Sequence, residues 1–397
     1  MNRREVKRAP VLRFKGFTND WEQRKLKNLV DFYSGLTYHP ENIREKGTFV
    51  IRSSNIKDGQ LVTGDNIFVA PEIVNSTYVK KDDIIVVVRN GSRKLIGKHT
   101  KLNFNLNNAV IGAFMTGIRS NNNNFINAIF DSDNFKREIH KNLGATINQI
   151  TTGELKRMNF YIPSLTSEQN YLGNLMKVLD KLITLQQRKL RLLKLLKKAT
   201  QQNIFASTEC LPKLKYRNLT GKWQLYRLKD VAKIIMGQSP NSKNYTQNPI
   251  DHILVQGNAD IRNGYVFPRI WTTEITKVAN KGDIILCVRA PAGDVGRTKF
   301  NVVIGRGVAA IKGNDFIFQQ LQFMKSSGYW KKYISGSTFE SINSNDIKNA
   351  KIFCPSQLEQ KNISSLLDDI DTSIQIQQKN ILDFKYIKQF LLQNMFI

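Results

Sequence analysis

Four features of this sequence have residue types and spacings that could carry out chemistry. Asn248-Pro249-Ile250-Asp251 is similar in pattern to an Asn-Pro-Pro-aromatic loop, which clamps a flipped base for methylation. Residues 359–361 read Glu-Gln-Lys, the spacing of a nuclease E-x-K element, and residues 305–307 read Gly-Arg-Gly. The histidines at positions 39, 99, 140 and 252 are candidates for acid–base catalysis. Each feature is catalytic only with partner groups nearby: a stacking aromatic residue and a cofactor loop for the first, a strand position for the second, a longer loop for the third, and acid–base or metal-ligand partners for the histidines.

The surrounding sequence does not supply those groups. The segment at Asn248 lacks the stacking aromatic residue, and no glycine-rich cofactor loop precedes it. The Glu-Gln-Lys triplet falls in a predicted helix rather than a strand, and Gly-Arg-Gly is too short for a phosphate-binding loop. Cys210, Cys287 and Cys354 are isolated from one another and from histidine, which argues against zinc and against disulfides. We therefore expect no catalytic residue, no metal and no cofactor on this chain.

The charge of the chain points to a polyanionic partner. Sixty Lys and Arg residues against 32 Asp and Glu give a formal charge of +28, which attracts phosphates. A ribosomal or membrane-surface protein could carry the same charge. However, no apolar run approaches the ~18 residues that span a membrane, and the basic N-terminus lacks an apolar signal core. We expect a cytoplasmic protein of two or more domains, with nucleic acid and no membrane as partner.

The sequence is an internal duplication. Matching elements are Pro10-x-Leu12-Arg13-Phe14 and Pro212-x-Leu214-Lys215-Tyr216, Trp21 and Trp223, Gly35 and Gly237, Asp83-Ile84-Ile85 and Asp283-Ile284-Ile285, Arg89 and Arg289, Gly144-Ala-Thr-Ile and Gly336-Ser-Thr-Phe, and Glu168-Gln169 and Glu359-Gln360. Two copies of this length predict a duplicated domain pair rather than a solenoid. The ends of the copies match better than the middles, which indicates a shared scaffold with two different working surfaces.

Each copy has the pattern of a mixed α/β domain followed by one long helix. Strands are predicted at residues 84–88, 160–162, 284–288 and 301–304, which are β-branched or aromatic runs bounded by turn residues. Short helices are predicted near Leu26 and Leu228 and over residues 134–142 and 316–326. The first copy carries its extra residues mainly between Gly97 and Gly144, where the run 121–124 of asparagines predicts a turn or a flexible loop tip.

The closing helices carry a heptad seam in both copies. The seam residues are Leu172, Met176, Leu179, Ile183, Gln186, Leu190 and Leu193 in the first helix, and Ile363, Leu367, Ile370, Ile374, Gln377, Ile381, Phe384 and Leu391 in the second. One Gln occupies the same position in each, and Lys197 and Lys388 interrupt the seam at equivalent places. Apolar a and d positions with a single polar residue are typical of a coiled coil. The alternative is an amphipathic helix packed on its own domain. At about 38 residues, or ~57 Å, the helices are longer than a small domain needs, which favours a paired, antiparallel spacer.

This arrangement resembles the DNA-specificity subunit of type I restriction-modification enzymes over essentially the whole chain. The resemblance is carried by Pro10 to Trp21, Trp223 to Gly237 with Gln238-Ser239-Pro240, Lys281-Gly282-Asp283-Ile284, Gly336 to Ile342, and Ile352 to Ile363. Each motif alone is weak, but their double occurrence in one order is specific. One departure is Lys81-Asp82-Asp83, where Gly-Asp is usual, which predicts a different turn there.

The resemblance implies an α/β (mixed α+β) fold with two similar target recognition domains in a pseudo-two-fold arrangement, separated by two long antiparallel coiled-coil helices. It implies a non-catalytic subunit that binds double-stranded DNA, two methyltransferase (M) subunits and restriction (R) subunits. S-adenosylmethionine, ATP and magnesium are then expected on the partners. The expected boundaries are 1–165 for the first recognition domain, 166–205 for the first spacer helix, 206–222 for the linker, 223–355 for the second recognition domain, and 356–397 for the second spacer helix.

Candidate DNA contacts lie in polar loops beside the predicted strands. They are Arg52, Asn55, Arg89, Asn90, Arg93, Lys94 and Lys98 in the first copy, and Gln256, Asn258, Arg262, Arg289, Arg297 and Arg306 in the second. Arg suits guanine, and Asn or Gln suits adenine. Each could equally be a solvated charge or a structural loop residue. Because Arg89 and Arg289 share a position in both copies, we expect them to serve phosphate binding or structure rather than base selection.

Two functions of other classes stay open at this point. The first is a catalytically self-sufficient DNA enzyme, such as a nuclease with an unrecognised site, which would cut DNA with magnesium and no partner. The second is an RNA-binding structural protein, which would prefer RNA to duplex DNA. The favoured interpretation remains a subunit that reads an asymmetric, bipartite, gapped target.

Overall fold

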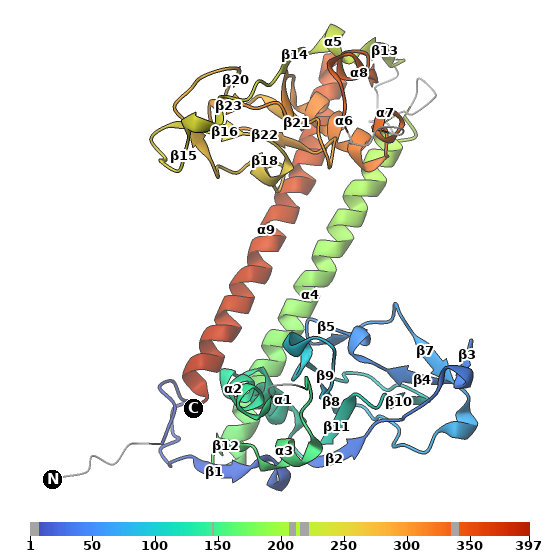
Figure 1. Ribbon diagram of the computed structural model, residues 1–397, viewed down its shortest axis with the longest axis vertical. Helices are drawn as coiled ribbons and strands as arrows, with labels where there is room; N and C mark the ends of the chain where they lie inside the picture. Colours follow the sequence, from blue (N-terminus) through green and yellow to red (C-terminus); the bar gives the residue numbers. More distant parts are fainter. Residues whose placement is uncertain (1–7, 145–146, 206–211, 215–221, 335–340) are drawn as a thin grey trace, which may run out of the picture. The chain divides into compact units, whose positions relative to one another are not determined.

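The computed structural model describes residues 8–144, 147–205, 212–214, 222–334 and 341–397. It divides into two compact units: unit 1 is residues 1–186 with 380–397, and unit 2 is residues 187–379. Each unit contains a mixed α/β domain and part of both long helices, so the predicted fold class is confirmed (Figure 1). The motif at Gly336, the middle of the motif at Gly144, and most of the opening repeat at Pro212 and of the linker 206–222 lie outside the described residues.

Unit 1 is built on two four-stranded sheets. Its elements are β1 (Glu22–Lys25), β2 (Asp31–Ser34), β3 (Ile43–Arg44), β4 (Thr48–Ile51), β5 (Ile56–Lys57), β6 (Gln60–Leu61), β7 (Ile67–Val69), β8 (Ile84–Val87), β9 (His99–Lys101), β10 (Ala109–Ile111), β11 (Met115–Arg119), α1 (Asn123–Asp131), α2 (Asp133–Asn142), α3 (Thr152–Arg157), β12 (Asn159–Ile162) and the start of α4 (Thr166–Ile204). The sheets have the orders β10-β4-β7-β3 and β2-β11-β8-β9. Antiparallel β1 and β12 pair Glu22 with Ile162 and so close the domain just before α4.

Unit 2 has the same plan, but its two main sheets contain six and five strands. Its elements are β13 (Gln224–Arg227), α5 (Leu228–Val231), β14 (Lys233–Met236), β15 (Tyr245–Thr246), β16 (His252–Val255), β17 (Ile261–Arg262), β18 (Tyr265–Val266), β19 (Trp271–Thr272), β20 (Val278–Ala279), β21 (Ile284–Cys287), β22 (Val295–Arg297), β23 (Val302–Ile304), β24 (Val308–Lys312), α6 (Asp315–Ser326), α7 (Lys331–Ile334), α8 (Ser344–Lys348), β25 (Lys351–Cys354) and α9 (Gln357–Met395). The sheets have the orders β14-β24-β21-β22-β18-β17 and β15-β19-β16-β23-β20. Here β13 and β25 pair Gln224 with Cys354, as β1 and β12 do in unit 1.

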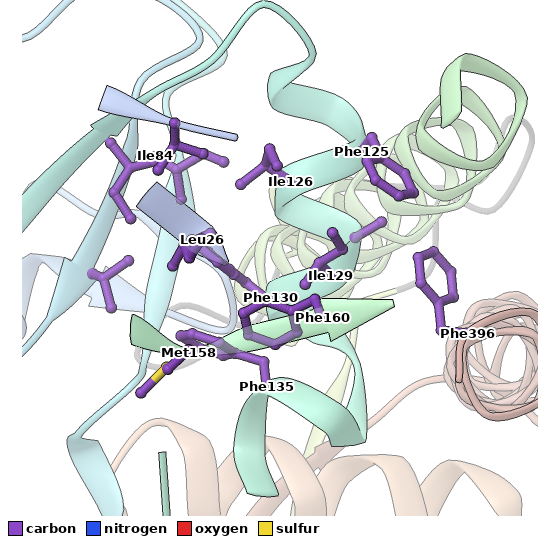
Figure 2. Packing of buried hydrophobic residues seen from close by; sticks show 14 of the residues in the cluster. Leu26, Ile84, Phe125, Ile126, Ile129, Phe130, Phe135, Met158, Phe160 and Phe396 are labelled. Carbon is purple, nitrogen blue, oxygen red and sulfur yellow. The ribbon is translucent and has the colours of Figure 1, made fainter. Parts of the chain in front are cut away.

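The central strand of each domain is buried on both faces, which explains its unbroken apolar sequence. In β8, Ile84 and Val86 face a core shared with α1, α2 and α4, whereas Ile85 and Val87 face a second core shared with β4 and β10. Strand β21 alternates in the same way between two cores. Figure 2 shows the first core of unit 1. There the rings of Phe130 and Phe135 stack, with 4.3 Å between the ring centroids.

A buried tryptophan–glutamate pair anchors each domain to its long helix. In unit 1, Trp21 Nε1 donates to Oε1 of Glu168 in the first turn of α4 at 3.4 Å. Arg13 adds an ion pair to the same carboxylate, with a distance of 2.6 Å from Nε to Oε1. In unit 2, Trp223 Nε1 donates to Oε1 of Glu359 at 3.3 Å. The repeated Trp and Glu of the sequence therefore make the same contact in both units. A buried carboxylate requires hydrogen-bond donors, and the indole N–H supplies one in each case.

Two glycines recur because two backbones cross closely beside them. A Cβ at Gly35 would lie 2.0 Å from the carbonyl oxygen of Gly112, and one at Gly237 would lie 2.1 Å from that of Gly305. The turn before the central strand is also shared. Asp82 has φ +71° where Gly282 has φ +92°, so both adopt the left-handed conformation. The different turn expected at Asp82 was wrong, since Asp is one of the few side chains that enter this region.

The asparagine run begins as a turn at residues 121–122, one of the two forms expected, and then enters a helix where a flexible tip was the other expectation. Asn122 is the N-cap of α1, and its side chain accepts a hydrogen bond from the backbone N–H of Phe125. Asn123 and Asn124 form the first turn of that helix. Asn is among the strongest N-cap residues, so the run begins a helix instead of ending in a loop.

The two described cysteines are buried and form no disulfide. Burial raises the pKa of Cys287 to about 12 and that of Cys354 to about 11, so at neutral pH both stay protonated. Only the thiolate is a strong nucleophile. We therefore expect iodoacetamide at pH 8 to leave both cysteines unmodified in the folded chain and to modify both in urea. Mass spectrometry of tryptic peptides checks this, and rapid modification of the folded chain would contradict the packing of β21 and β25.

Candidate nucleic-acid interface and helix pair

The loops that follow the central strands form an exposed rim in each domain. Arg89 follows β8 and Arg289 follows β21, and both side chains are exposed. Each lies in an isolated β-bridge, Arg89 with Gln149 and Arg289 with Ser341. The guanidinium of Arg89 lies 5.0 Å from the ring centroid of Phe114, a side chain that is 52% exposed. The two arginines therefore occupy one structural position.

Several candidates of the first copy gather around Ser53. Asn90 Nδ2 donates to Ser53 Oγ at 2.9 Å, and Lys98 Nζ donates to the Ser53 carbonyl at 3.4 Å. Arg52 precedes Ser53 and pairs with Asp65 at 2.7 Å. Beyond them, residues 93 and 94 are an exposed Arg and Lys. This end of the domain carries adjacent donors at the surface, as a groove-reading or phosphate-binding site requires.

Asn55 is the member of this set that cannot reach a ligand in this conformation, because its side chain is fully buried. Its Oδ1 accepts from the backbone N–H of Arg52 at 2.9 Å, and its Nδ2 donates to the carbonyl of Val62 at 3.4 Å. These bonds hold the loop after β4. Asn55 therefore stabilises the conformation of the rim loop without being exposed in it.

In unit 2 the rim is formed by Gln256, Arg289 and Arg306. Arg306 is exposed, and its backbone N–H donates to Ser239 Oγ at 3.0 Å. Gln256 is half-buried, and a Cβ at the neighbouring Gly307 would lie 1.9 Å from its carbonyl oxygen, so these two loops are in direct contact. Asn258 is half-buried in the next turn.

Two further candidates of unit 2 lie away from this rim. Arg262 is exposed, with its guanidinium 3.9 Å from the ring centroid of Phe267. Arg297 is half-buried and ion-paired, with NH2 at 2.6 Å from Asp315, and its guanidinium lies over Phe318 of α6. Arg297 thus connects β22 to α6.

Equivalent backbone bonds align the two rims residue by residue. The N–H of Arg52 donates to Asn55 Oδ1 at 2.9 Å, and that of Gln256 donates to Asp260 Oδ2 at 2.7 Å. Gly112 and Gly305 donate to the last residues of β4 and β16. Residues 113–114, Ala-Phe, therefore correspond to residues 306–307, Arg-Gly. The shared backbone therefore presents Arg52, Ala113 and Phe114 in unit 1, and Gln256, Arg306 and Gly307 at the equivalent positions of unit 2.

Phe114 was missed by reasoning from the sequence. A single Phe after Gly-Ala belongs to no recognisable motif, and its exposure cannot be read from the sequence. Its exposure becomes visible only when β10 is placed beside β4 and β11 beside β8. The signal that could have found it is its position at a loop where the two copies differ.

The long helices pair in antiparallel fashion within each unit. In unit 1 the C-terminal Met395 and Phe396 pack with Leu172 and Met176 of early α4. In unit 2 the late α4 residue Ile204 packs with Ile363 of early α9. All fifteen seam residues are buried or half-buried. In contrast, Tyr171, Val178, Leu185 and Leu192, spaced by seven residues on α4, are between 49% and 57% exposed.

The lysines that interrupt the seam are the centres of two ion-pair clusters. In unit 1, Lys388 Nζ lies 2.7 Å from Asp131 Oδ2 and 2.5 Å from Asp180 Oδ1. In unit 2, Lys197 Nζ lies 2.6 Å from Asp371 Oδ1 and 2.7 Å from Gln322 Oε1. The two clusters are equivalent in the duplicated sequence. Adding the repeat offset of 191 to residues 131, 180 and 197 gives residues 322, 371 and 388. Each cluster joins α4, α9 and a helix of the recognition domain.

The cluster of unit 1 also contains His99. His99 Nε2 lies 3.1 Å from Asp131 Oδ1, and Nδ1 lies 3.0 Å from the carbonyl oxygen of Gly97. Burial alone would raise the pKa of Asp131, but His99 and Lys388 outweigh it and hold that pKa well below its usual range. Burial raises the pKa of Asp180. Burial alone would lower the pKa of Lys388, but the carboxylates of Asp131 and Asp180 outweigh it and raise that pKa.

Replacing Lys388 by Met should loosen the end of α9 in unit 1. Removal of the cation leaves Asp180 without this partner and Asp131 with His99 alone. We expect this to cost about 2–3 kcal/mol, less than for a fully buried pair, because the Asp180 side chain is 40% exposed. Hydrogen exchange of residues 380–397 should accelerate about 30-fold or more. Lys385→Met, an exposed lysine on the same helix, is the matched control. Unchanged exchange in Lys388→Met would show that the cluster does not hold the helix.

The segments that imitate catalytic motifs have structural roles. Glu359 is 3% exposed and bonded to Trp223, and Gly307 lies against the backbone of Gln256. The backbone N–H of Asp251 donates to the carbonyl of Asn248, which makes that segment a turn. Among the described residues, no group of three or more His, Cys, Asp or Glu could hold a metal ion. Over the same residues, no helix has both the length and the apolar composition to cross a membrane.

Comparison with known proteins gives a consistent family. The family described as "Type I restriction modification DNA specificity domain" matches residues 18–195 and 220–383. The putative type I restriction enzyme MjaX specificity subunit of Methanocaldococcus jannaschii is 28% identical over 395 residues, covering 91% of this chain and 89% of the relative. The type I restriction enzyme EcoKI specificity subunit of Escherichia coli is 26% identical over 160 residues, 38% of this chain and 34% of the relative.

Solved structures share the fold. A type I restriction-modification S subunit from M. genitalium has a TM-score of 0.68 at 15% identity, covering 98% of this chain and 99% of the other. A chain from a structure on complex assembly and conformational transition of the type I R-M system has a TM-score of 0.55 at 21% identity, covering 94% and 96%. At these identities the likeness concerns the fold alone.

Proposed function

The chain belongs to the family of type I restriction modification DNA specificity domains, and from this premise we propose that it is the non-catalytic DNA-reading subunit of a type I restriction-modification complex. Each recognition domain reads one half of a bipartite target, and several unread base pairs separate the halves. The chain positions methyltransferase subunits for adenine N6 methylation and restriction subunits for cleavage. Its place of action is the cytoplasm.

The observation that carries this proposal is the pair of equivalent rims with different side chains. One backbone arrangement presents Arg52 and Phe114 in unit 1, and Gln256 and Arg306 in unit 2. Arg suits guanine, Gln suits adenine, and an apolar ring suits the thymine methyl group. Two such surfaces read different bases, so the target is asymmetric. Arg89 and Arg289, which the rims share, supply phosphate contacts that carry no sequence information.

Two linked domains improve selectivity over one. A domain in one groove reads only a few base pairs, because each base edge needs its own hydrogen bonds. Linking two domains makes the second docking intramolecular and multiplies their selectivity. Helices α4 and α9 each run from one unit into the other without interruption, so their length sets the gap.

The helices also offer surface for partners. The residues Tyr171, Val178, Leu185 and Leu192 form an exposed row at heptad position c of α4, on the side of the helix away from the buried seam. An exposed apolar row of this kind is a docking face for a helix of another protein. We assign this row to a methyltransferase subunit. Two such subunits, one for each half of the target, bind S-adenosylmethionine, while restriction subunits use ATP and magnesium.

A direct test combines the purified chain with a candidate methyltransferase subunit, S-adenosylmethionine and random-sequence duplex DNA. We expect methyl transfer to adenine only when both proteins are present. We also expect the chain alone, with magnesium, to leave the DNA intact. Cleavage by the chain alone would favour the self-sufficient nuclease instead, and stronger competition by RNA than by duplex DNA would favour an RNA-binding protein.

A further inference from the structure

One face of α4 carries five exposed cations in a row. They are Lys177, Lys181, Arg188, Arg191 and Lys198, here called the basic row. Steps of four, seven, three and seven residues keep them on one side of the helix. With the seam at heptad positions a and d, the basic row falls at b and f, on the side of α4 away from the seam.

The equivalent face of α9 lacks this row. At the offset of 191 the five positions hold Asp368, Thr372, Lys379, Leu382 and Gln389, with a single cation. Over their whole lengths α4 carries eight Lys or Arg and two Asp or Glu residues, whereas α9 carries four and five. Because the two helices hold the same place in a duplicated fold, the fold itself does not require the basic row.

The basic row has no carboxylate partner in the part of the chain that the structure describes. Among the described residues none of its five members forms a salt bridge, although Lys197 and Lys388 on the same helices do. Lys177 and Lys181 are four residues apart, and Arg188 and Arg191 are three apart. Each pair of like charges at such spacing destabilises the helix by a few tenths of a kcal/mol. An external anion would remove this repulsion.

The row also continues onto the recognition domain of unit 1. Lys177 and Lys181 line a cavity of about 600 Å³ together with the exposed Lys81. The β5–β6 hairpin reaches α4 beside them, where Gln60 Nε2 donates to Thr184 Oγ1 at 2.6 Å. The cations of the helix and of the domain thus meet at this cavity, whose lining also contains the carboxylates of Asp58, Asp82, Asp131 and Asp180.

We propose that the basic row of α4 binds the phosphates of the unread base pairs between the two half-sites. This inference rests on the proposed function. The 21 residue steps from Lys177 to Lys198 span about 32 Å of helix, the length of about nine base pairs at 3.4 Å each. Contacts to phosphates carry no sequence information, so they hold the gap without reading it. Helix α4 is then a DNA-binding element as well as a spacer.

The test compares two triple variants of the full chain. Lys181→Gln/Arg188→Gln/Arg191→Gln removes three members of the basic row, and Lys361→Gln/Lys379→Gln/Lys385→Gln removes three exposed lysines of α9 as a matched control. Binding to a duplex with both half-sites is measured by fluorescence anisotropy between 50 and 200 mM salt. Each lost phosphate contact lowers the slope of log K against log salt by about 0.9. We expect the first variant to lower the slope by about 2.7 and to bind on the order of 100-fold more weakly at 0.1 M salt, with an unchanged preference between half-sites. The control should match the wild type.

A second measurement locates the contacts. Methylphosphonates that neutralise the gap phosphates should weaken binding of the wild-type chain more than that of the first variant, since that variant keeps only Lys177 and Lys198 of the basic row. An unchanged salt slope in the first variant, or equal loss in both proteins with the neutral gap, would overturn the inference while leaving the proposed function intact. Loss of the methyltransferase subunit with a normal slope would assign the row to a protein partner instead. A wild-type chain with no preference for any duplex would overturn both proposals.

Discussion

Exchanging residues 223–355 for the corresponding domain of another specificity subunit is expected to replace one half of the methylated target and to leave the other half unchanged. The exchange points coincide with strands β13 and β25, whose antiparallel pairing closes the domain at Gln224 and Cys354. The replaced residues lie wholly in unit 2, and the cores of unit 1 contain none of them. The recognition rim of unit 1 therefore stays intact.

The effect should be complete at the exchanged half. Each mismatched base pair costs about 1–3 kcal/mol, so a half-site of several base pairs loses all preference for its former sequence. Detection of modified bases reads both halves in one measurement. The reciprocal exchange of residues 22–162, bounded by β1 and β12, is the matched control and should alter only the other half. Simultaneous change of both halves in either chimera would break the modular interpretation.

Inserting one heptad into each long helix is expected to abolish binding to the original gapped target. Insertion after residue 186 of α4 and after residue 379 of α9 falls at the boundary of the two units, so the contacts inside each unit are kept. Seven residues preserve the a and d pattern and add about 10 Å. Both domains then no longer dock together on the old target, and the loss of intramolecular binding weakens it by about 100-fold or more.

A longer gap should restore part of that binding. Ten ångströms correspond to about three base pairs at 3.4 Å, so a target extended by this number should bind best, with both half-sites unchanged. A variant with seven substitutions at exposed positions of the same helices, without added length, should keep the original gap. If the insertion variant still prefers the original gap, the helices do not set it.

Much of the architecture could be predicted because it depends on local patterns. The period of the seam predicted α4 and α9, and the β-branched runs predicted β8, β12, β21 and β23. In contrast, Lys197 and Lys388 looked like breaks in the seam. Their carboxylate partners, Asp371 and Asp180, lie 174 and 208 residues away in sequence. No local rule connects residues so far apart.

For the candidate site, the sequence predicted which loops carry it but not which side chains of those loops are exposed. Arg89 and Arg289 were expected to share a place, and the structure gives them equivalent exposed positions after β8 and β21. Asn55 resembled a surface amide, but its side chain is buried because the turn after β4 needs its hydrogen bonds. Phe114 was not among the candidates, although it is exposed at the rim. Exposure of a loop residue depends on which strands meet beneath it, and the sequence does not show that.

The most direct test of the central claim is genome-wide detection of modified bases in cells that carry this chain with its candidate methyltransferase subunit, compared with cells that carry the methyltransferase alone. We predict N6-methyladenine at one gapped, asymmetric motif, present only with this chain. Methylation at the same motif without the chain, or an ungapped or palindromic motif with it, would contradict the assignment of two different half-sites to the two recognition domains.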